Sequence, residues 1–299
     1  MTRVLVSGGT GLVGSFIVEH LLTNGYKVTV GGRTPPSLNA FSKPVSFVPL
    51  HLDPEADQIE AFDNIYYFVH AAFDHLPGKY RGGEGDDPKG FQAKNLDGTV
   101  RLFEAAKDAG VRRTCFLSSR AAYGTQPSGT LLTEGLLCRP DTLYGSVKLM
   151  AERSLHSLCG HGFVTASLRV TGVYGSARLG QPHKWQGLFE DYLAGRPVAR
   201  RAGTEVHGAD VASAVRLMLD TDSIRVSGET FNVSDILIDN RMILAPLKER
   251  THCPHPLPDT ADATDYNKMS TCKIGALGWT PGGRERLQQT LHDDLGLLA

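Results

Sequence analysis

The sequence predicts an α/β fold with a doubly wound parallel sheet, and three observations lead to this expectation. Short apolar runs alternate with segments of helical periodicity along most of the 299-residue chain. The runs are nearly continuous in Val, Ile, Leu and Phe, as in strands that are covered on both faces. A glycine-rich turn joins the first apolar run to the first helical segment. Strands that alternate with helices form a mainly parallel sheet with helices on both faces.

Each expected element follows from a local pattern. Apolar runs that stop at glycine or polar residues predict strands at 4–6, 27–30, 45–50, 65–72, 114–117, 164–170 and 230–233. Apolar residues at helical spacing predict helices at 12–22, 98–109 and 143–158. Asn24-Gly25 and Gly110 terminate the first two helices, and Asp141 or Thr142 is the expected N-cap of the third.

Composition excludes several classes of function. The chain carries 31 Lys and Arg against 32 Asp and Glu, a net charge of −1, so no overall field attracts nucleic acid or an anionic membrane. No apolar run approaches the ~18 residues that a membrane-spanning helix needs. The first strand starts near Arg3, so we expect no signal peptide. The five cysteines form no Cys-x-x-Cys pair, which favours a reducing cytoplasm.

The turn at 7–14, Ser-Gly-Gly-Thr-Gly-Leu-Val-Gly, is the first candidate binding site. Gly8, Gly11 and Gly14 permit a tight turn, close main-chain approach to a diphosphate and close packing of helix on strand. The N–H groups at the start of the helix face such an anion. A tight turn without a ligand is the alternative, but the place of the motif in a βαβ unit favours a dinucleotide.

The end of the second predicted strand indicates which dinucleotide is bound. A carboxylate there accepts the ribose hydroxyls of NAD and repels the 2′-phosphate of NADP. Here the residues are Gly31, Gly32 and Arg33, and a guanidinium pairs well with phosphate. The sequence therefore favours NADP, with NAD as the alternative. Arg33 at the start of a solvated loop, with no ligand, is the competing interpretation.

Three residues form a candidate catalytic group. Ser119 follows the fifth predicted strand, and Tyr144 and Lys148 share one face of the third helix. A nearby ammonium favours the phenolate form of a tyrosine, which can then exchange a proton with an alcohol or carbonyl during hydride transfer. The serine orients the reacting oxygen. A Tyr-x-x-x-Lys pair alone is often a surface pair. Here the serine and this pair follow the glycine turn in the order that the chemistry requires, which favours a catalytic role.

These motifs together resemble the extended short-chain dehydrogenases/reductases of the NAD-dependent epimerase/dehydratase family. The resemblance covers most of residues 1–235. Besides the glycine turn, it is carried by Val-His-Ala-Ala at 69–72, Asn-Leu-Asp-Gly-Thr-Val-Arg-Leu-Phe-Glu-Ala-Ala at 95–106, Phe-Leu-Ser-Ser-Arg-Ala-Ala-Tyr-Gly at 116–124, Tyr-x-x-x-Lys at 144–148, Leu-Arg-Val-Thr-Gly-Val-Tyr-Gly at 168–175, His-Gly-Ala-Asp-Val-Ala at 207–212, Phe-Asn-Val at 231–233 and Leu-Gly-Trp-Thr-Pro at 277–281.

The resemblance implies a Rossmann-type sheet, the catalytic group Ser119, Tyr144 and Lys148, and often a homodimer. The cofactor-binding residues expected from the motifs and the resemblance are Gly8, Thr10, Gly11, Leu12, Val13, Gly14, Arg33, Leu52, Ala71, Ala72, Asn95, Tyr144, Lys148 and Val170.

Two stretches interrupt the alternation and are expected to form a second lobe. We predict that 1–175 and 204–235 form the NAD(P)-binding Rossmann domain. Residues 176–203 and 236–299 are then a smaller substrate-binding lobe at the carboxyl edge of the sheet, where open α/β sheets bind ligands. The predicted substrate residues are Arg120, Tyr174, Arg178 and Trp185.

Departures from the family pattern bear on the substrate. Arg120 and Ala121 stand where dehydratases of the family carry carboxylates, which argues against elimination of water. Gly172 replaces an asparagine that touches the sugar nucleotide in related enzymes, and Gly203 replaces an arginine of a second nucleotide clamp. A substrate without a nucleotide is therefore favoured. The alternative is that the arginines at 178, 196, 200 or 201 replace these clamps, since a guanidinium binds phosphate from several directions.

The leading hypothesis is an NAD(P)-dependent oxidoreductase acting at a secondary alcohol or ketone of a small, polar, sugar-derived substrate. A nucleotide-sugar epimerase with tightly bound NAD is the alternative. A non-catalytic, cofactor-binding regulatory protein is disfavoured because Tyr144 and Lys148 are both present. We expect no metal, since the His-Cys-Pro-His run at 252–255 matches no familiar zinc spacing.

Overall fold

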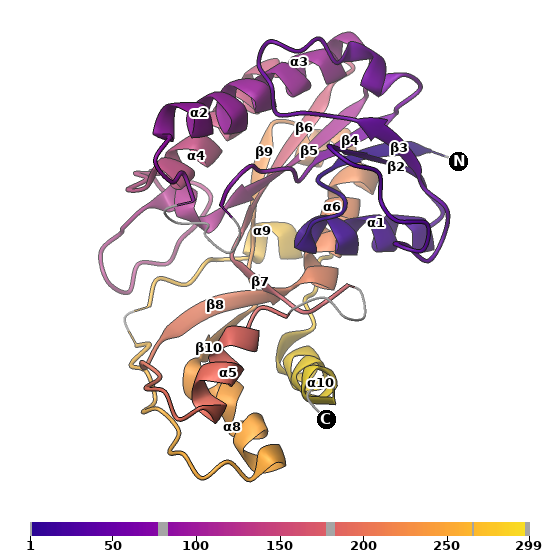
Figure 1. Ribbon diagram of the computed structural model, residues 1–299. Coiled ribbons are helices and arrows are strands. Elements are labelled where there is room, and N and C mark those ends of the chain that lie inside the picture. Colours follow the sequence, from indigo (N-terminus) through magenta and orange to yellow (C-terminus); the bar gives the residue numbers. More distant parts are fainter. Residues whose placement is uncertain (1, 77–82, 178–182, 265, 297–299) are drawn as a thin grey trace.

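The large unit of the molecule is a seven-stranded sheet of order β3-β2-β1-β4-β5-β6-β9. The computed structural model describes residues 2–76, 83–177, 183–264 and 266–296 (Figure 1). Every neighbouring pair in this sheet is parallel. Its strands are β1 Arg3–Ser7, β2 Lys27–Gly32, β3 Ser46–Pro49, β4 Tyr67–His70, β5 Arg113–Ser119, β6 Val164–Val170 and β9 Glu229–Val233. The predicted doubly wound fold is confirmed.

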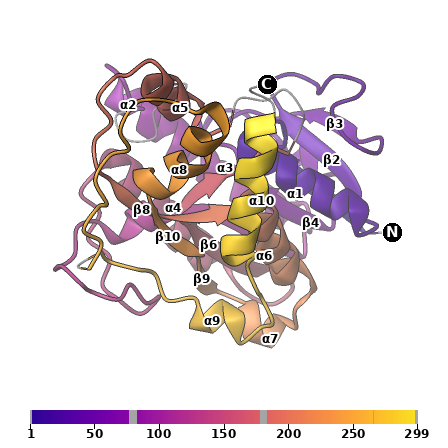
Figure 2. The same ribbon diagram turned by 90° about the horizontal axis from the view of Figure 1, so that it is seen from below.

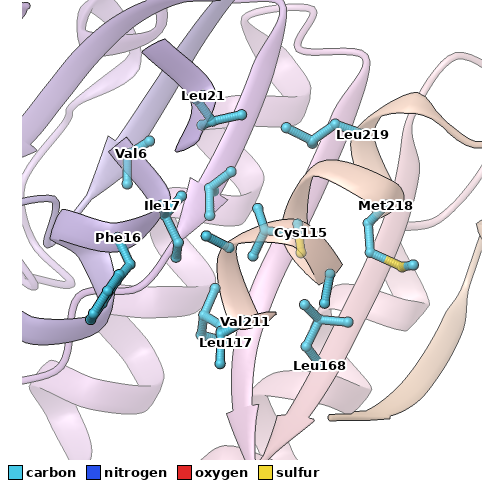
Figure 3. Close-up of a cluster of buried hydrophobic side chains, with 14 of the residues drawn as sticks. Val6, Phe16, Ile17, Leu21, Cys115, Leu117, Leu168, Val211, Met218 and Leu219 are labelled. Carbon is cyan, nitrogen blue, oxygen red and sulfur yellow. The ribbon is translucent and has the colours of Figure 1, made fainter. Parts of the chain in front are cut away.

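Helices cover both faces of this sheet (Figure 1). On one face lie α1 Leu12–Thr23 and α6 Gly208–Asp220, and on the other lie α3 Thr99–Asp108 and α4 Leu143–Leu158. Val6 of β1 packs with the first pair, and the adjacent Leu5 packs with the second pair. Figure 3 shows the first of these cores, with Ile17 of α1 and Val211 of α6 turned toward Leu117 of β5. Alternate residues of one strand thus serve two cores.

The helical segment before β5 starts earlier than the sequence predicts. The expected helix at 98–109 is preceded without a break by α2 Pro88–Gln92 and by the π-helical segment η2 Ala93–Gly98. Asp87 caps the start, since its Oδ1 accepts a hydrogen bond of 2.9 Å from the backbone N–H of Gly90. Pro88 stands in the first turn, where a missing N–H costs nothing. These start signals lie ahead of the apolar periodicity, so the periodicity alone misses them.

A second, three-stranded sheet of order β10-β8-β7 lies beside the carboxyl edge of the large one (Figure 1). It pairs β7 Gly172–Tyr174, β8 Ala202–His207 and β10 Ile236–Asp239, with β8 and β10 antiparallel. Strands therefore come from both predicted lobes, and the lobe boundaries stay a prediction. Apolar side chains on this sheet pack against α5 Gln186–Leu193, α8 Asn240–Thr251 and α10 Gly283–Gly296. Figure 2 views the molecule from this side, with α8 and α10 in front.

The remaining short helices fill connections. They are η1 Ile59–Phe62, η3 Arg120–Tyr123, α7 Ser223–Val226 and α9 Cys272–Gly275. Among the residues that are described, no helix has the length and apolar character needed to cross a membrane.

Candidate active site at the carboxyl edge of the large sheet

The glycine turn between β1 and α1 is closed by contacts that only glycine permits. Gly8 has a φ of 69°, and a Cβ built there lies 2.7 Å from Cα of Ala72. A Cβ on Gly14 lies 2.1 Å from the carbonyl oxygen of Gly8. The backbone N–H of Gly11 donates to that same oxygen at 3.0 Å. Any larger residue at Gly8 or Gly14 therefore forces the turn open.

The start of α1 matches the requirements of a dinucleotide diphosphate. Gly11 is the N-cap, and no side chain caps the helix. Thr10 and Gly11 are exposed, while Leu12 and Val13 are half-buried against the core. Backbone N–H groups at a helix start attract an anion that approaches closely, and the absence of side chains at Gly8 and Gly11 permits that approach. The residues present thus fit the expected cofactor.

The segment after β4 is fixed against this turn by a buried histidine. His70 contacts Ser7 Oγ through Nδ1 at 2.7 Å and Thr99 Oγ1 through Nε2 at 3.0 Å. Burial, with a smaller effect from the Lys148 charge, lowers the pKa of His70 to about 3. The imidazole is therefore neutral at physiological pH. It holds Ala71, whose N–H donates to the carbonyl of Ser7 at 3.2 Å, beside the glycine turn.

Asn95 supports the same segment from η2. Its Oδ1 accepts from the backbone N–H of Asp74 at 2.7 Å, and its Nδ2 donates to the carbonyls of Asp74 at 2.7 Å and Phe91 at 3.0 Å. The side chain is 1% exposed. Asn95 thus positions the loop that follows Ala72, and its direct contact with the cofactor stays a prediction.

Arg33 extends into solvent from the end of β2. Its side chain is 80% exposed, and its guanidinium lies 3.8 Å from the carboxylate of Asp74. Lys94 pairs with the same carboxylate at 2.9 Å. Arg33 after β2 and Lys94 of η2 thus both pair with the carboxylate of Asp74, which follows β4. Leu52, another predicted contact, is half-buried beside Gly98, and Val170 is buried at the end of β6.

Ser119, Tyr144 and Lys148 lie at the edge that also holds the glycine turn. Ser119 ends β5, and its Oγ accepts from the N–H of Ala121 at 3.2 Å, which leaves its own O–H to donate. Thr142 caps α4 and so sets the helix that carries Tyr144 and Lys148. The Lys148 Nζ lies 6.0 Å from the centre of the Tyr144 ring. Tyr144 and Lys148 are thus neighbours on α4, Ser119 ends β5, and the roles of all three stay predictions.

Lys148 is a buried amine with mainly aromatic neighbours. Its side chain is 5% exposed, and Nζ donates to the carbonyl of Leu117 at 2.7 Å. Nζ also lies over the rings of Phe73 at 4.4 Å and Phe116 at 4.8 Å. Burial lowers the pKa of Lys148 to about 7, and the charge of Glu152 opposes this shift. The charge of the amine is thus sensitive to small changes near neutral pH.

Behind the site, a buried polar network joins α4 to three strands. Glu152 accepts from Ser118 and pairs with Arg169, whose Nη2 lies 2.7 Å from the carboxylate. The Arg169 guanidinium lies 4.6 Å from the centre of the Tyr123 ring. The hydroxyl of Tyr123 donates to Asn232 Oδ1 at 2.7 Å. Because the ion pair is buried on both sides, removal of one partner leaves an uncompensated charge.

A later part of the chain closes this network. Residues 266–271, here called the strap, run alongside Leu132, which forms a β-bridge with Met269. Asn232 Nδ2 donates to the carbonyl of Leu132 at 2.9 Å and to that of Ser270 at 3.1 Å. The strap also carries Tyr266, whose ring lies 5.2 Å from the Arg120 guanidinium.

The residues predicted to bind substrate are placed differently from one another. Arg120 is half-buried and donates to the carbonyl of Asn267 at 2.9 Å. Tyr174 is fully buried and Trp185 is 6% exposed, and their rings stack at 5.3 Å in the core of the small sheet. Contact of these two rings with substrate stays a prediction. Arg178 lies outside the described residues.

The space beside Gly172 is filled by an ion pair. A Cβ built on Gly172 lies 2.5 Å from both Lys184 Nζ and Glu205 Oε2, which pair with each other. A side chain at this position therefore competes with the pair. The Lys184–Glu205 ion pair therefore occupies space that is available only because residue 172 is glycine.

Other polar and hollow regions lie apart from this edge. Open hollows of about 350 and 500 Å³ lie at the amino edge of the large sheet and share Tyr67 in their walls. A depression at the amino edge is far from the ends of β1 and β5, so the residue chemistry, and not the size of a hollow, defines the candidate site. Within the described residues, no three His, Cys, Asp or Glu side chains are grouped to hold a metal ion.

Sequence reasoning missed several residues that shape the site. His70, Phe73 and Glu152 contact or surround the predicted catalytic group. Only Glu152 carried a usable signal, because it lies one helical turn beyond Lys148 on the same face. The contacts of His70 and Phe73 depend on the pairing of distant segments.

Comparison with known proteins identifies a family and two kinds of relative. Residues 4–234 match the model of the NAD dependent epimerase/dehydratase family. A 3-beta-hydroxysteroid dehydrogenase of Mycolicibacterium neoaurum is 31% identical over 64% of this chain and 52% of that protein. A UDP-glucose 4-epimerase of Bacillus subtilis (strain 168) is 30% identical over 69% of this chain and 64% of that protein. The matches span 52% and 54% of the first curated relatives, little more than half of their length.

Solved structures are similar over nearly the full chain. The UDP-glucose 4-epimerase of Thermus thermophilus, in complex with NAD, has a TM-score of 0.74 at 28% identity and covers 94% of each chain. MoeE5 in complex with UDP-glucose and NAD has a TM-score of 0.76 at 26% identity, covering 99% of this chain and 100% of that one.

Proposed function

Since the chain belongs to the NAD-dependent epimerase/dehydratase family, we propose that it oxidises and reduces a secondary alcohol carbon with Tyr144 as acid and base. The observation that carries the proposal is a continuous set of contacts. Gly8 abuts Ala72, and the next residue, Phe73, contacts both Tyr144 and Lys148. The glycine turn, which we propose holds the cofactor, and the Tyr144–Lys148 pair are thus connected at the carboxyl edge of the large sheet.

Each residue has a role that its surroundings support. The bound nicotinamide supplies the hydride acceptor and donor. Ser119 donates to the reacting oxygen and orients it. Tyr144 removes the hydroxyl proton during oxidation and returns a proton to the carbonyl oxygen during reduction, and the positive charge of Lys148 favours its phenolate form. Gly8, Gly11 and Gly14 admit the diphosphate to the start of α1.

Epimerisation of a nucleotide-linked sugar with retained NAD is the form of the reaction that we favour. UDP-glucose 4-epimerases are among the relatives at about 30% identity, and structures similar at 26–28% identity are complexes with NAD. This reverses the order in which the sequence alone ranked the two hypotheses. In such a reaction the same Tyr144 acts twice, once in each direction.

Net oxidation or reduction with exchangeable NADP is the second candidate. It is favoured by Arg33 at the end of β2 and by the Lys184–Glu205 pair beside Gly172. It also agrees with the 3-beta-hydroxysteroid dehydrogenase among the relatives. For either candidate we propose the lobes predicted from the sequence, a homodimer and a cytoplasmic location.

One experiment tests the proposal and separates its two forms. The dinucleotide that copurifies with the protein is released and identified by mass spectrometry, and the protein is then incubated with UDP-glucose. We expect retained NAD and formation of the C4 epimer. Exchangeable NADP with turnover of keto-sugars and NADPH favours the second form instead.

The common chemistry is tested by Tyr144→Phe. We expect this variant to keep its fold, since only a hydroxyl is removed, and we expect turnover to fall at least ~100-fold because the proton carrier is lost. Thr142→Ser, which keeps the cap of α4, is the matched control and stays active. Undiminished turnover in Tyr144→Phe contradicts the proposed function in both forms.

A further inference from the structure

Phe73 stands between the two residues proposed to handle the proton. It follows Ala72 after β4, while Tyr144 and Lys148 come from α4. Its ring centre lies 5.1 Å from that of Tyr144, with the ring planes at 85°. The same ring centre lies 4.4 Å from Lys148 Nζ. An edge-to-face ring pair fixes both separation and tilt, so Phe73 restricts the phenol as well as the amine.

The Lys148 amine is held between two aromatic faces. Phe116 of β5 lies 4.8 Å from Nζ, whereas Phe73 belongs to the segment that follows β4. The carbonyl of Leu117 accepts one N–H of the amine at 2.7 Å. Aromatic faces attract a cation most strongly where water is excluded, and the side chain is 5% exposed. The rings therefore favour the charged form against the cost of burial.

The charged and titratable groups around the amine act in known directions. Glu152, one turn further along α4, favours the ammonium, but its carboxylate is already bound by Ser118 and Arg169. His70 on β4 is buried and has a pKa lowered to about 3, so it brings no positive charge to the site near neutral pH. Tyr144 is a further titratable neighbour, since its ring centre lies 6.0 Å from Lys148 Nζ. Besides Phe73, the Lys148 ammonium is thus favoured by the Glu152 carboxylate, and it is not opposed by a positive charge on His70.

We propose that Phe73 is a positioning residue, whose ring holds the Lys148 ammonium in its charged form and sets the phenol of Tyr144 at a fixed place beside it. The inference rests on the proposed function, since it explains how the acid–base pair is kept competent. It assigns to Phe73 no contact with substrate or cofactor. Removal of the ring should change the protonation of Lys148 as well as the rate.

The direct test follows the titration of Lys148 without any substrate. The protein is labelled with lysine carrying ¹³C at Cε, and the Lys148 signal is assigned with Lys148→Arg. In Phe73→Leu, which keeps an apolar side chain but no ring, we expect the midpoint of titration to fall by about one pH unit. Phe73→Tyr keeps the ring and should restore the midpoint of the unchanged protein.

A matched control separates this role from simple packing. The Phe91 ring packs on that of Phe73 at 5.5 Å and is buried, so Phe91→Leu removes a ring from the same cluster. We expect Phe91→Leu to lower thermal stability and leave the Lys148 midpoint unchanged. An unchanged midpoint in Phe73→Leu overturns the inference, as does an equal shift in Phe91→Leu. Should Phe73→Leu fail to fold, Phe73→Met takes its place with the same expected shift.

Measurement of turnover is a second test of Phe73. It also separates a failure of the proposed function from a failure of the inference about Phe73. We expect Phe73→Leu to lower kcat about tenfold with KM nearly unchanged, and to displace the pH profile of kcat. If Tyr144→Phe retains full turnover, the proposed function fails while the titration still reports on Phe73. If the titration is insensitive to Phe73, the inference fails whatever the activity.

Discussion

At the scale of single residues, Arg33 is the side chain that we expect to influence whether the protein binds NADP or NAD. It is mostly exposed and pairs with Asp74 at the long distance of 3.8 Å, so it can turn toward a phosphate at little cost. A charge-assisted contact of this kind contributes roughly 1.5–3 kcal/mol. The nearby Asp74 carboxylate acts in the opposite sense, since it repels a 2′-phosphate.

We expect Arg33→Ser to weaken binding of NADP by about 10- to 100-fold and to leave binding of NAD nearly unchanged. The measurement is titration calorimetry with each dinucleotide on protein stripped of bound cofactor. Arg153→Ser removes an exposed arginine of α4 and serves as the control. An unaltered ratio of the two affinities shows that Arg33 does not read the 2′-phosphate.

The sequence was informative about residues whose spacing is local. Tyr144 and Lys148 share a helix face by their separation alone, and Ser119 is placed by the end of its strand. Phe73 was not predicted, because its importance arises from contacts with Tyr144 and Lys148 that only the assembled sheet creates. Glu152 shares a helix face with Lys148, but its pairing with Arg169 depends on β6. A side chain that acts through a distant partner leaves no periodic signal.

At the scale of elements, long periodic segments were predicted best. The helix at 143–158 and the strand at 164–170 have the predicted bounds. The helix predicted at 98–109 matches α3 to within one residue at each end. The preceding α2 and η2 at 88–98 were not predicted, because their cap and proline precede the apolar pattern. The short β7 and β8 were not predicted, since a strand of a few residues is defined by its partner more than by its own composition.

The turn between β1 and α1 gives a prediction at this scale. Gly14→Ala places a Cβ 2.1 Å from the carbonyl oxygen of Gly8, so the helix must move away from the strand. We expect a loss of roughly 1–3 kcal/mol in the free energy of unfolding and a fall in dinucleotide affinity of ~100-fold or more. Denaturant melts and fluorescence titration with the dinucleotide measure the two effects.

Gly187→Ala is the matched control for this change. Gly187 lies in α5, and a Cβ built there meets no atom within 4 Å. Alanine is the better helix former, so stability should stay the same or rise slightly. Equal behaviour of the two variants is incompatible with a tight turn at Gly14.

At the scale of the whole molecule, alternation of strands and helices was enough to predict the large sheet. The small sheet was not predictable in the same way, because its strands come from three separate parts of the chain, at 172–174, 202–207 and 236–239. Their pairing depends on tertiary contacts with α5, α8 and α10. The carboxyl edge between the two sheets is consequently the part of the molecule that sequence patterns describe least.

The buried His70 couples the stability of the whole fold to pH. Its pKa is about 3 in the folded chain against 6.5 for a free imidazole, so the unfolded chain binds one more proton between these values. Stability is complete above pH ~6.5 and falls by about 1.4 kcal/mol per pH unit below it, until pH ~3. We expect His70→Gln to remove this part of the slope in urea unfolding at pH 7.5, 6.0 and 5.0.

His161→Gln is the control, because it replaces a histidine that is exposed. The absolute stability of His70→Gln is not the quantity to compare, since the substitution also alters the contacts to Ser7 and Thr99. The difference between pH values is the decisive quantity. A slope equal to that of the unchanged protein contradicts the assignment of a neutral, buried His70.

The strap has a consequence for the order in which the protein is made. A ribosome releases the glycine turn, Ser119, Tyr144 and Lys148 well before it releases Asn232 and Met269. Until those later residues emerge, the Tyr123 hydroxyl lacks the Asn232 oxygen that accepts its hydrogen bond. Leu132 likewise lacks Met269, its partner in the β-bridge. The residues of the candidate active site are thus synthesised before Asn232 and the strap, whose contacts complete the buried network behind that site.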